Sequence, residues 1–219
     1  MRAHFSFIRA MALANALAAF SLPAFAVADL VLKRDLDTKS DVTCSSETAF
    51  GNFVADAVKK SQGAELAILS CSVITGNRTI AQGTTFDATA AAAEVSADAR
   101  SIQIEATGMQ LLEALEQALA SAPAASATFP QVAGVRLVID LGKPAGQRIV
   151  KLTVNGAALD FQKTYRVALN EDMAKSLSAL ASARRIEGQA MPVAADVSAH
   201  LQQVGVRDIK VLGRIKTIN

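Results

Sequence analysis

Residues 47–70 read ETAFGNFVADAVKKSQGAELAILS, and this stretch decides the fold class of the chain. Apolar side chains recur every three or four residues across its first half, which predicts an amphipathic helix over residues 47–61. Ser46 is expected to cap the start of this helix, and Gly63 is expected to end it. The run LAIL at 66–69 then predicts a short buried strand. A helix followed closely by a buried strand is typical of an α/β arrangement.

The same patterns, followed outward from this stretch, predict further helices and strands in alternation. A hairpin signal, Asn155-Gly156, lies in the middle of the chain and argues against an all-parallel sheet. The fold class is therefore α/β (α+β), a single domain with a mixed β-sheet flanked by helices. The expected loop covers residues 70–83, the expected helices 86–95, 109–121, 170–180 and 194–204, and the expected strands 101–105, 135–141, 148–154, 165–169 and 209–218.

The N-terminus has the composition of a secretory signal peptide, expected over residues 1–26. Arg2 and Arg9 give a basic start, residues 10–22 are almost entirely apolar, and Ala24-Phe25-Ala26 offers an A-x-A exit, with a second register two residues later. The apolar run is shorter than the ~20 residues that span a bilayer, so no stable membrane insertion is expected. We therefore expect a periplasmic or secreted protein. After the signal peptide we expect a lead-in segment over 27–45 and a domain over 46–219.

The net charge and the number of histidines limit the classes of function that the chain can have. The chain has 22 Lys+Arg and 20 Asp+Glu, and the leader holds two of the basic residues, so the remainder is neutral. A neutral chain gives no electrostatic case for binding nucleic acid. His200 is the one histidine outside the leader. His200, Cys44 and Cys71 together are too few ligands for a closed zinc site. An even number of cysteines in an oxidising compartment instead favours a disulfide.

An ordered series of motifs then points to a family. The motifs run from the helix at 47–61 to the end of the chain, and no single one is decisive. In this order and spacing they resemble the C-terminal domain of secreted 5′-nucleotidases and UDP-sugar hydrolases, over about residues 36–218. The series is ETxxGNxxADA (47–57), AELAI (64–68), a loop ending in Arg78, EATGxxLLEALE (105–116), FPQVAGV (129–135), RIVxLTVNGxxLD (148–160), KTYRVAxN (163–170) and GRI (213–215).

The resemblance implies a substrate-recognising domain without its catalytic partner. In that family a separate N-terminal metallophosphoesterase domain holds two metal ions and hydrolyses the substrate. Two metals need several His, Asp and Asn ligands, and the short segment before Glu47 has no room for such a domain. We therefore expect no catalytic residues, no metal and no cofactor in this chain, which would act on its own as a non-enzyme.

The resemblance also implies which residues would hold a nucleotide. Two family arginines that grip phosphate correspond here to Ser40 and Cys44, so most of that anion clamp is lost. Asn77 and Arg78 end the loop after the first buried strand, and Arg78 retains the charge that would meet a phosphate. Asn170 matches the asparagine that ends a later strand. The regions that supply aromatic faces for the base, 94–99 and 171–175, contain no aromatic residue here.

A disulfide between Cys44 and Cys71 follows from the same resemblance. Both positions lie at one end of the family's fold, around the phosphate. The bridge would close a loop of roughly 27 residues and occupy the former anion site.

Alternatives to a binding role, and to the favoured function, remain open at this point. Arg78 could be an ordinary solvated loop residue, and Asn170 could serve only to cap the helix after it. The favoured function is an exported, non-catalytic module with a degenerate nucleotide site that binds another exported protein or a small anion. The alternative is a nucleotide-recognition subunit whose metallophosphoesterase is a separate chain. A third hypothesis, an enzyme with rebuilt chemistry, suits a chain with one histidine least.

Overall fold

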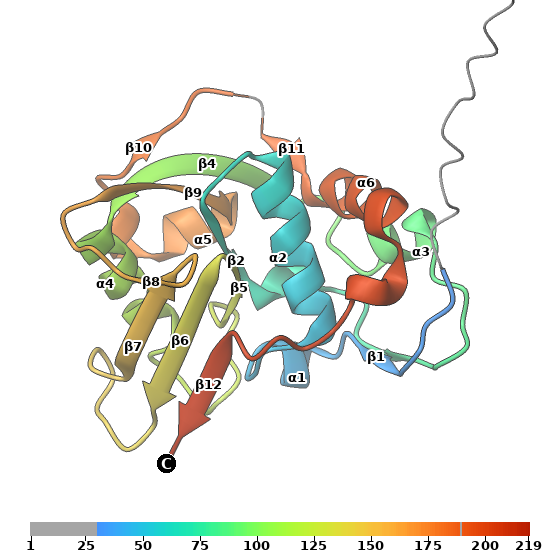
Figure 1. Ribbon diagram of the computed structural model, residues 1–219, viewed down its shortest axis with the longest axis horizontal. Helices are drawn as coiled ribbons and strands as arrows, with labels where there is room; N and C mark the ends of the chain where they lie inside the picture. The colour runs from blue at the N-terminus through green and yellow to red at the C-terminus, as the bar shows by residue number, and fades with distance from the viewer. Residues whose placement is uncertain (1–29, 189) are drawn as a thin grey trace, which may run out of the picture.

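A computed structural model describes residues 30–188 and 190–219, so the expected signal peptide lies outside the described residues (Figure 1). The predicted fold class is confirmed: helices flank mixed β-sheets. The elements in chain order are β1 (Leu36–Asp37), α1 (Ser40–Thr43), α2 (Ala49–Ser61), β2 (Leu66–Ser70), η1 (Cys71–Val73), β3 (Thr79–Ile80), α3 (Ala88–Ala93), β4 (Arg100–Thr107), α4 (Gly108–Ala118), β5 (Pro130–Ala133), β6 (Val135–Asp140), β7 (Ile149–Val154), β8 (Ala157–Ala158), β9 (Thr164–Asn170), α5 (Glu171–Ser176), η2 (Ser178–Leu180), β10 (Arg184–Arg185), β11 (Met191–Pro192), α6 (Val193–Val204), η3 (Val206–Asp208) and β12 (Ile215–Ile218).

The strands form three sheets. In the largest, β10, β4, β9, β2 and β5 lie side by side in that order, and β11 also pairs with β4. Within it β2 runs parallel to β9 and antiparallel to β5. A second sheet has the order β12, β6, β7, β8, with β12 parallel to β6, and β1 pairs with β3 separately. Both larger sheets are therefore mixed, as the hairpin signal predicts.

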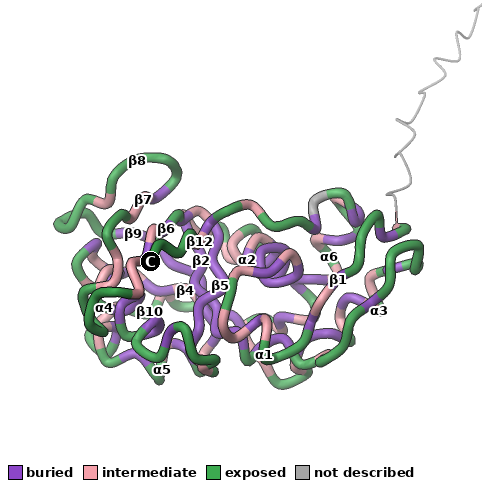
Figure 2. The backbone as a smooth tube through the Cα atoms, turned by 90° about the horizontal axis from the view of Figure 1, so that it is seen from below, coloured by how far each residue is buried: buried purple, intermediate pink, exposed green. Residues whose placement is uncertain are grey.

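The centre of the molecule is strand β2, whose five residues are all buried. Leu66 and Ile68 pack into one hydrophobic core, whereas Ala67 and Leu69 pack into a second one on the opposite face. This alternation is the period-two pattern of a strand covered on both sides. Helices α2, α3 and α6 contribute to one core, and α4, α5 and the four-stranded sheet to the other. Figure 2 accordingly shows β2, β4 and β5 as buried chain inside the fold.

Helix α2 begins two residues later than the sequence predicts. Thr48, in extended conformation, is the N-cap, and its Oγ1 accepts a hydrogen bond from Gly51 N at 3.1 Å. Ser46 does not cap the helix, because its Oγ donates to the carbonyl oxygen of Val42 at 2.9 Å. The expected cap was wrong because the hydroxyl of Ser46 is already used by the turn that ends α1.

Other differences arise where tertiary contacts override local pattern. Strand β5 begins at Pro130 and was not expected, since its pairing to β2 joins residues about sixty positions apart. The expected final strand, 209–218, is ordered as a strand only from Ile215. The expected helix 170–180 ends at Ser176 and continues as a separate 3-10 turn.

The segment before α2 packs against the domain. Leu32 and Leu36 are buried in the core shared with α2, and β1 pairs with β3. Across the described residues, no helix combines the length and the apolar character that crossing a bilayer requires.

Candidate functional site

β2 and β9 are parallel neighbours, so their carboxyl ends lie side by side at the same end of the large sheet. Ser70 ends β2 and Asn170 ends β9. Asn170 is 1% exposed; its Oδ1 accepts a hydrogen bond from Ser70 N at 3.0 Å, and its Nδ2 donates to Ser70 Oγ at 3.2 Å. The carboxyl edge of an α/β sheet is where such folds usually bind ligands.

Asn170 does not cap the helix that follows it. It occupies the N-cap position of α5, yet its side chain makes no capping hydrogen bond. That alternative interpretation is therefore wrong, because the side-chain amide is used to join the ends of the two strands. The asparagine therefore holds the ends of β2 and β9 together.

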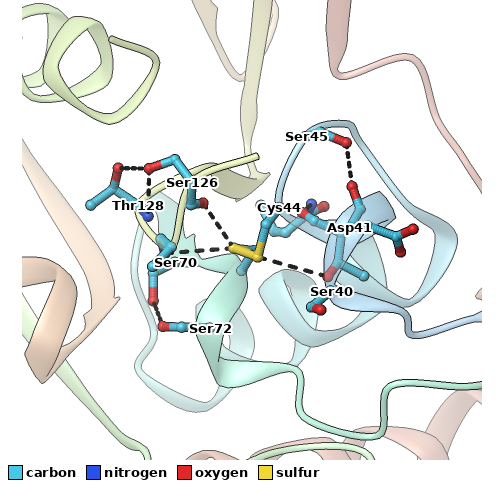
Figure 3. Close-up of a disulfide and its surroundings, with 12 residues drawn as sticks. Ser40, Asp41, Cys44, Ser45, Ser70, Ser72, Ser126 and Thr128 are labelled. Carbon is cyan, nitrogen blue, oxygen red and sulfur yellow. Dashed lines mark hydrogen bonds between the residues drawn. A yellow bond between two sulfur atoms is a disulfide. The ribbon is translucent and has the colours of Figure 1, made fainter. Parts of the chain in front are cut away.

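The predicted disulfide between Cys44 and Cys71 is present at the same edge. Their Cα atoms are 5.1 Å apart, within the usual range for a bridge. Cys71 directly follows Ser70, so the bridge joins the end of β2 to the segment after α1 (Figure 3). The bridge links these two stretches of chain at the position where the family resemblance implies arginines that grip phosphate.

Several hydroxyl side chains lie near this disulfide, and Figure 3 also shows the carboxylate of Asp41 in α1. The Oγ atoms of Ser70 and Ser72 are 2.6 Å apart, and Ser126 Oγ lies 2.9 Å from Thr128 Oγ1. The backbone N of Ser126 donates to the carbonyl oxygen of Cys44 at 2.9 Å. Three separate stretches of chain thus converge on the bridge, and each brings hydroxyl side chains to it (Figure 3).

Gln131 positions the segment that carries Cys44. It is 1% exposed, and its Nε2 donates to the carbonyl oxygens of Thr43 at 2.7 Å and Ser46 at 2.8 Å. Helix α2 passes so close that a Cβ on Gly51 would lie 2.0 Å from Gln131 Oε1. The sequence motif contains Gln131, but its role depends on contacts more than eighty residues distant and gives no local signal.

Arg78 forms an ion pair with Glu94. Glu94 Oε1 accepts hydrogen bonds from Nε of Arg78 at 2.9 Å and from Nη2, while Glu94 Oε2 accepts from Thr38 Oγ1 at 2.8 Å. The side chain of Glu94 is 1% exposed, whereas that of Arg78 is 58% exposed. The guanidinium charge that the sequence offers to a phosphate is therefore balanced by a buried carboxylate of the same chain. Sequence reasoning missed Glu94, which ends an alanine-rich helix and carries no motif.

Asn77, the neighbour of Arg78, is also engaged within the protein. Its Oδ1 lies 3.3 Å from Ser40 N and 3.4 Å from Ser40 Oγ, both of which can donate to it. A Cβ on Gly76 would lie 1.6 Å from Glu94 Oε2 and 2.8 Å from Thr38 Oγ1, so a larger residue there would displace these side chains. The loop is shaped around the chain's own carboxylate.

The predicted site residues therefore fall into two connected groups. Asn170 contacts Ser70, next to Cys71 of the bridge, whereas Asn77 contacts Ser40, whose carbonyl oxygen accepts from Cys44 N at 3.0 Å. Both groups are joined through the disulfide at the carboxyl end of β2. We call these residues, together with Arg78, which follows Asn77, the disulfide ring.

The first motif of the series, ETxxGN, serves to attach the last strand. Glu47 Oε1 accepts from Asn52 Nδ2 at 2.6 Å and from Leu212 N at 2.9 Å, and its Oε2 accepts from Ile215 N at 2.9 Å. Because these bonds connect the start of α2 to the segment entering β12, Glu47 has a structural role here.

The part of the chain that the structure describes contains no group of three or more His, Cys, Asp or Glu side chains arranged to hold a metal ion. His200 packs against Phe53, with ring centroids 5.0 Å apart.

Comparison with known proteins gives one family. Residues 28–180 match the family described as 5'-nucleotidase, C-terminal domain. The chain is 30% identical over 150 residues to the trifunctional nucleotide phosphoesterase protein YfkN of Bacillus subtilis (strain 168). The aligned region covers 62% of this chain and 10% of that protein.

Solved structures show the same fold. The 5'-nucleotidase precursor from Thermus thermophilus superposes with a TM-score of 0.73 at 25% identity, covering 88% of this chain and 40% of that one. The NAD nucleotidase of Haemophilus influenzae gives a TM-score of 0.69 at 15% identity, over 90% of this chain and 39% of its own. The chain thus spans well under half the length of these proteins. It belongs to the 5'-nucleotidase C-terminal domain family.

Proposed function

We propose that this chain is an exported, non-catalytic binding domain of the family whose nucleotide site has lost its anion grip. The ion pair of Arg78 with buried Glu94 is the observation that carries the proposal. A phosphate entering here would have to compete with a carboxylate that the fold already places on the guanidinium. Charge-assisted hydrogen bonds of this kind are among the stronger ones, so the competition is unfavourable to a ligand.

The disulfide supports the same conclusion. The family resemblance implies that Cys44 and Ser40 correspond to the two arginines that grip phosphate. Cys44 is held in the bridge, and the amide and hydroxyl of Ser40 are directed to Asn77. Neither position supplies a positive charge. A bridge that replaces a binding residue stabilises the framework of the site without retaining its affinity for phosphate.

Export is supported by the disulfide and by the leader-like N-terminus. Protein disulfides persist mainly in oxidising compartments such as the periplasm or the cell exterior. The ligand class proposed for the domain is another exported protein or a small anion.

The second candidate function is nucleotide recognition for a metallophosphoesterase supplied by another chain. It is favoured by the 58% exposure of the Arg78 side chain, which leaves the guanidinium reachable from solvent. The names of the relatives, a nucleotide phosphoesterase and a 5'-nucleotidase, agree with such a role.

Thermal-shift measurements on the domain with AMP and adenosine separate the two functions. Wild type is compared with Arg78→Ala, and Arg184→Ala serves as the matched control because Arg184 also pairs with a glutamate, Glu105, elsewhere on the surface. We expect AMP to raise the melting temperature of wild type and of Arg78→Ala no more than adenosine does, because the site no longer grips the phosphate. Stabilisation by AMP that disappears in Arg78→Ala but persists in Arg184→Ala would instead establish the second function.

A further inference from the structure

A polar pocket lies where the starts of β6 and β12 meet the turn after β7, and its lining includes neither cysteine of the disulfide. Its volume is about 260 Å³, smaller than the pockets of about 300–1,000 Å³ that take drug-sized ligands, so it suits a small molecule or a single chemical group. Figure 1 shows β6 and β12 running in the same direction, which brings their starts to one end of the sheet. The pocket is lined by Gly134, Val135, Arg136, Asn155, Gly156, Leu212 and Arg214.

Two arginines line this pocket. Arg136 belongs to β6, and Arg214 directly precedes β12, whose first residue, Ile215, pairs with Leu137 of β6. The parallel pairing of the two strands therefore brings both arginines to the same end of the sheet.

Each arginine is held in place by hydrogen bonds to carbonyl oxygens. Arg136 donates from Nη1 to the carbonyl oxygens of Leu212 and Gly213, both at 3.1 Å. Arg214, only 9% exposed, donates from Nη1 to the carbonyl oxygen of Val132 at 2.6 Å and to that of Asn52 at 3.3 Å. Because both side chains are already ordered, a ligand would lose little entropy in arranging them.

These bonds do not use all the donors of either guanidinium, which carries five N–H groups. The bonds named for Arg136 use two, and those for Arg214 use three when the ion pair from Nη2 to Asp56 at 2.7 Å is included. Asp56 balances one of the two charges, but it is not among the residues that line the pocket. The lining itself contains two cations and no carboxylate.

The turns around the pocket add polarity and space. Gly134 and Gly156 have φ angles of +73° and +86° and place bare backbone at the pocket wall. A Cβ on Gly134 would lie 2.6 Å from the carbonyl oxygen of Glu65 and 3.1 Å from Cε of Lys59, so the chain is closely packed behind this wall. The pocket is thus small, and its lining carries two guanidinium groups.

We propose that this pocket binds a small oxyanion, a phosphate or carboxylate group, through Arg136 and Arg214. Guanidinium groups present paired N–H donors that match both kinds of oxyanion. The site is distinct from the ring around the disulfide, and it does not depend on the function proposed for that ring.

Titration of isotopically labelled domain with inorganic phosphate, followed by NMR, tests the proposal. Acetate distinguishes carboxylate from phosphate, and chloride at equal ionic strength controls for screening. We expect a dissociation constant on the order of 1 mM for at least one oxyanion, with the largest shifts at the amides of Gly134, Gly156 and Gly213. Arg136→Ala should weaken binding by about tenfold or more, and Arg136→Lys, which keeps the charge, should weaken it less.

Two controls keep the test decisive. Arg78→Ala should leave these shifts unchanged, because Arg78 belongs to the disulfide ring and is not among the residues that line this pocket. Lys151→Ala, an exposed cation on β7 outside the pocket lining, should also leave them unchanged. Chloride-like shifts with both oxyanions, or binding that survives Arg136→Ala in a folded variant, would overturn the proposal. Loss of binding in Arg78→Ala alone would assign the oxyanion to the disulfide ring and overturn it as well.

Discussion

Glu94 is almost completely buried, and its Oε1 atom accepts hydrogen bonds from both Nε and Nη2 of the mostly exposed Arg78. The pair is therefore asymmetric: the carboxylate depends on the arginine far more than the arginine depends on the carboxylate. Without the arginine, the buried carboxylate keeps the hydrogen bond from the hydroxyl of Thr38 but loses its positively charged partner. Removing the carboxylate leaves a cation that water can solvate.

This asymmetry predicts the outcome of a double-mutant cycle. Arg78→Met should lower the free energy of unfolding by about 1–3 kcal/mol, the cost of leaving a buried polar group unsatisfied. Adding Glu94→Gln should recover part of that loss, because no buried charge remains. Urea denaturation of the four proteins measures the coupling. Strictly additive effects would show that the ion pair contributes nothing to stability.

The disulfide should account for a larger share of stability. It joins residues separated by 27 positions, and closing a loop of that length in the unfolded chain is worth about 3–4 kcal/mol. Cys44→Ala combined with Cys71→Ala should therefore lower the melting temperature by about 10 °C, which calorimetry can measure. Reduction of the wild type should give a similar change. If both treatments leave the melting temperature unaltered, the bridge does not constrain the unfolded chain.

Two carboxylates should give stability profiles of opposite slope with pH. Burial raises the pKa of Asp196, against the hydrogen bonds from Ser61 and Ser101. The folded state therefore binds the proton of Asp196 more tightly than the unfolded state does, and its contribution to stability falls as pH rises through the raised pKa. Relative to wild type, Asp196→Asn should become more stable as pH increases from about 4 to about 7.

Glu65 supplies the matched comparison. The hydrogen bond from Lys163, followed by that from Arg166 N, lowers the pKa of Glu65. Its stabilisation is present above the ordinary carboxyl pKa and is lost as pH falls through the lowered one. Glu65→Gln should thus be most destabilising near neutral pH. Urea denaturation across the pH range checks both variants, and parallel profiles for the two would contradict the assignment.

Glu47 should control the last strand locally. Its carboxylate accepts from Leu212 N and Ile215 N, so Glu47→Ala leaves both amides without this partner. Hydrogen exchange should accelerate at these two amides by about tenfold or more, corresponding to the loss of about 1.4 kcal/mol of local stability. The amides of β2 should exchange as in wild type. Acceleration spread evenly over the whole domain would mean that Glu47 stabilises the fold globally instead.

The framework could be predicted from sequence where local pattern and tertiary structure agree. The periodicity of α2 and the apolar run of β2 are local properties, and both elements formed within two residues of their expected bounds. The cysteine pairing followed from the family resemblance. The partners of the candidate site residues could not be predicted, because Glu94 and Ser70 meet Arg78 and Asn170 through the fold, across 16 and 100 residues. No spacing rule in the sequence encodes such contacts.

If the site has lost its anion grip in the way proposed, part of the grip should be recoverable. Ser40 lies against Asn77, the neighbour of Arg78, so Ser40→Arg would add a guanidinium beside that loop. Glu94→Gln would release Arg78 from its carboxylate. The double variant should bind AMP roughly tenfold to a hundredfold more tightly than Ser40→Gln with Glu94→Gln, since each charge-assisted hydrogen bond contributes about 1.5–3 kcal/mol. Isothermal titration calorimetry measures the difference. Equal affinity in the two variants would show that residues 40 and 78 do not face a common phosphate position.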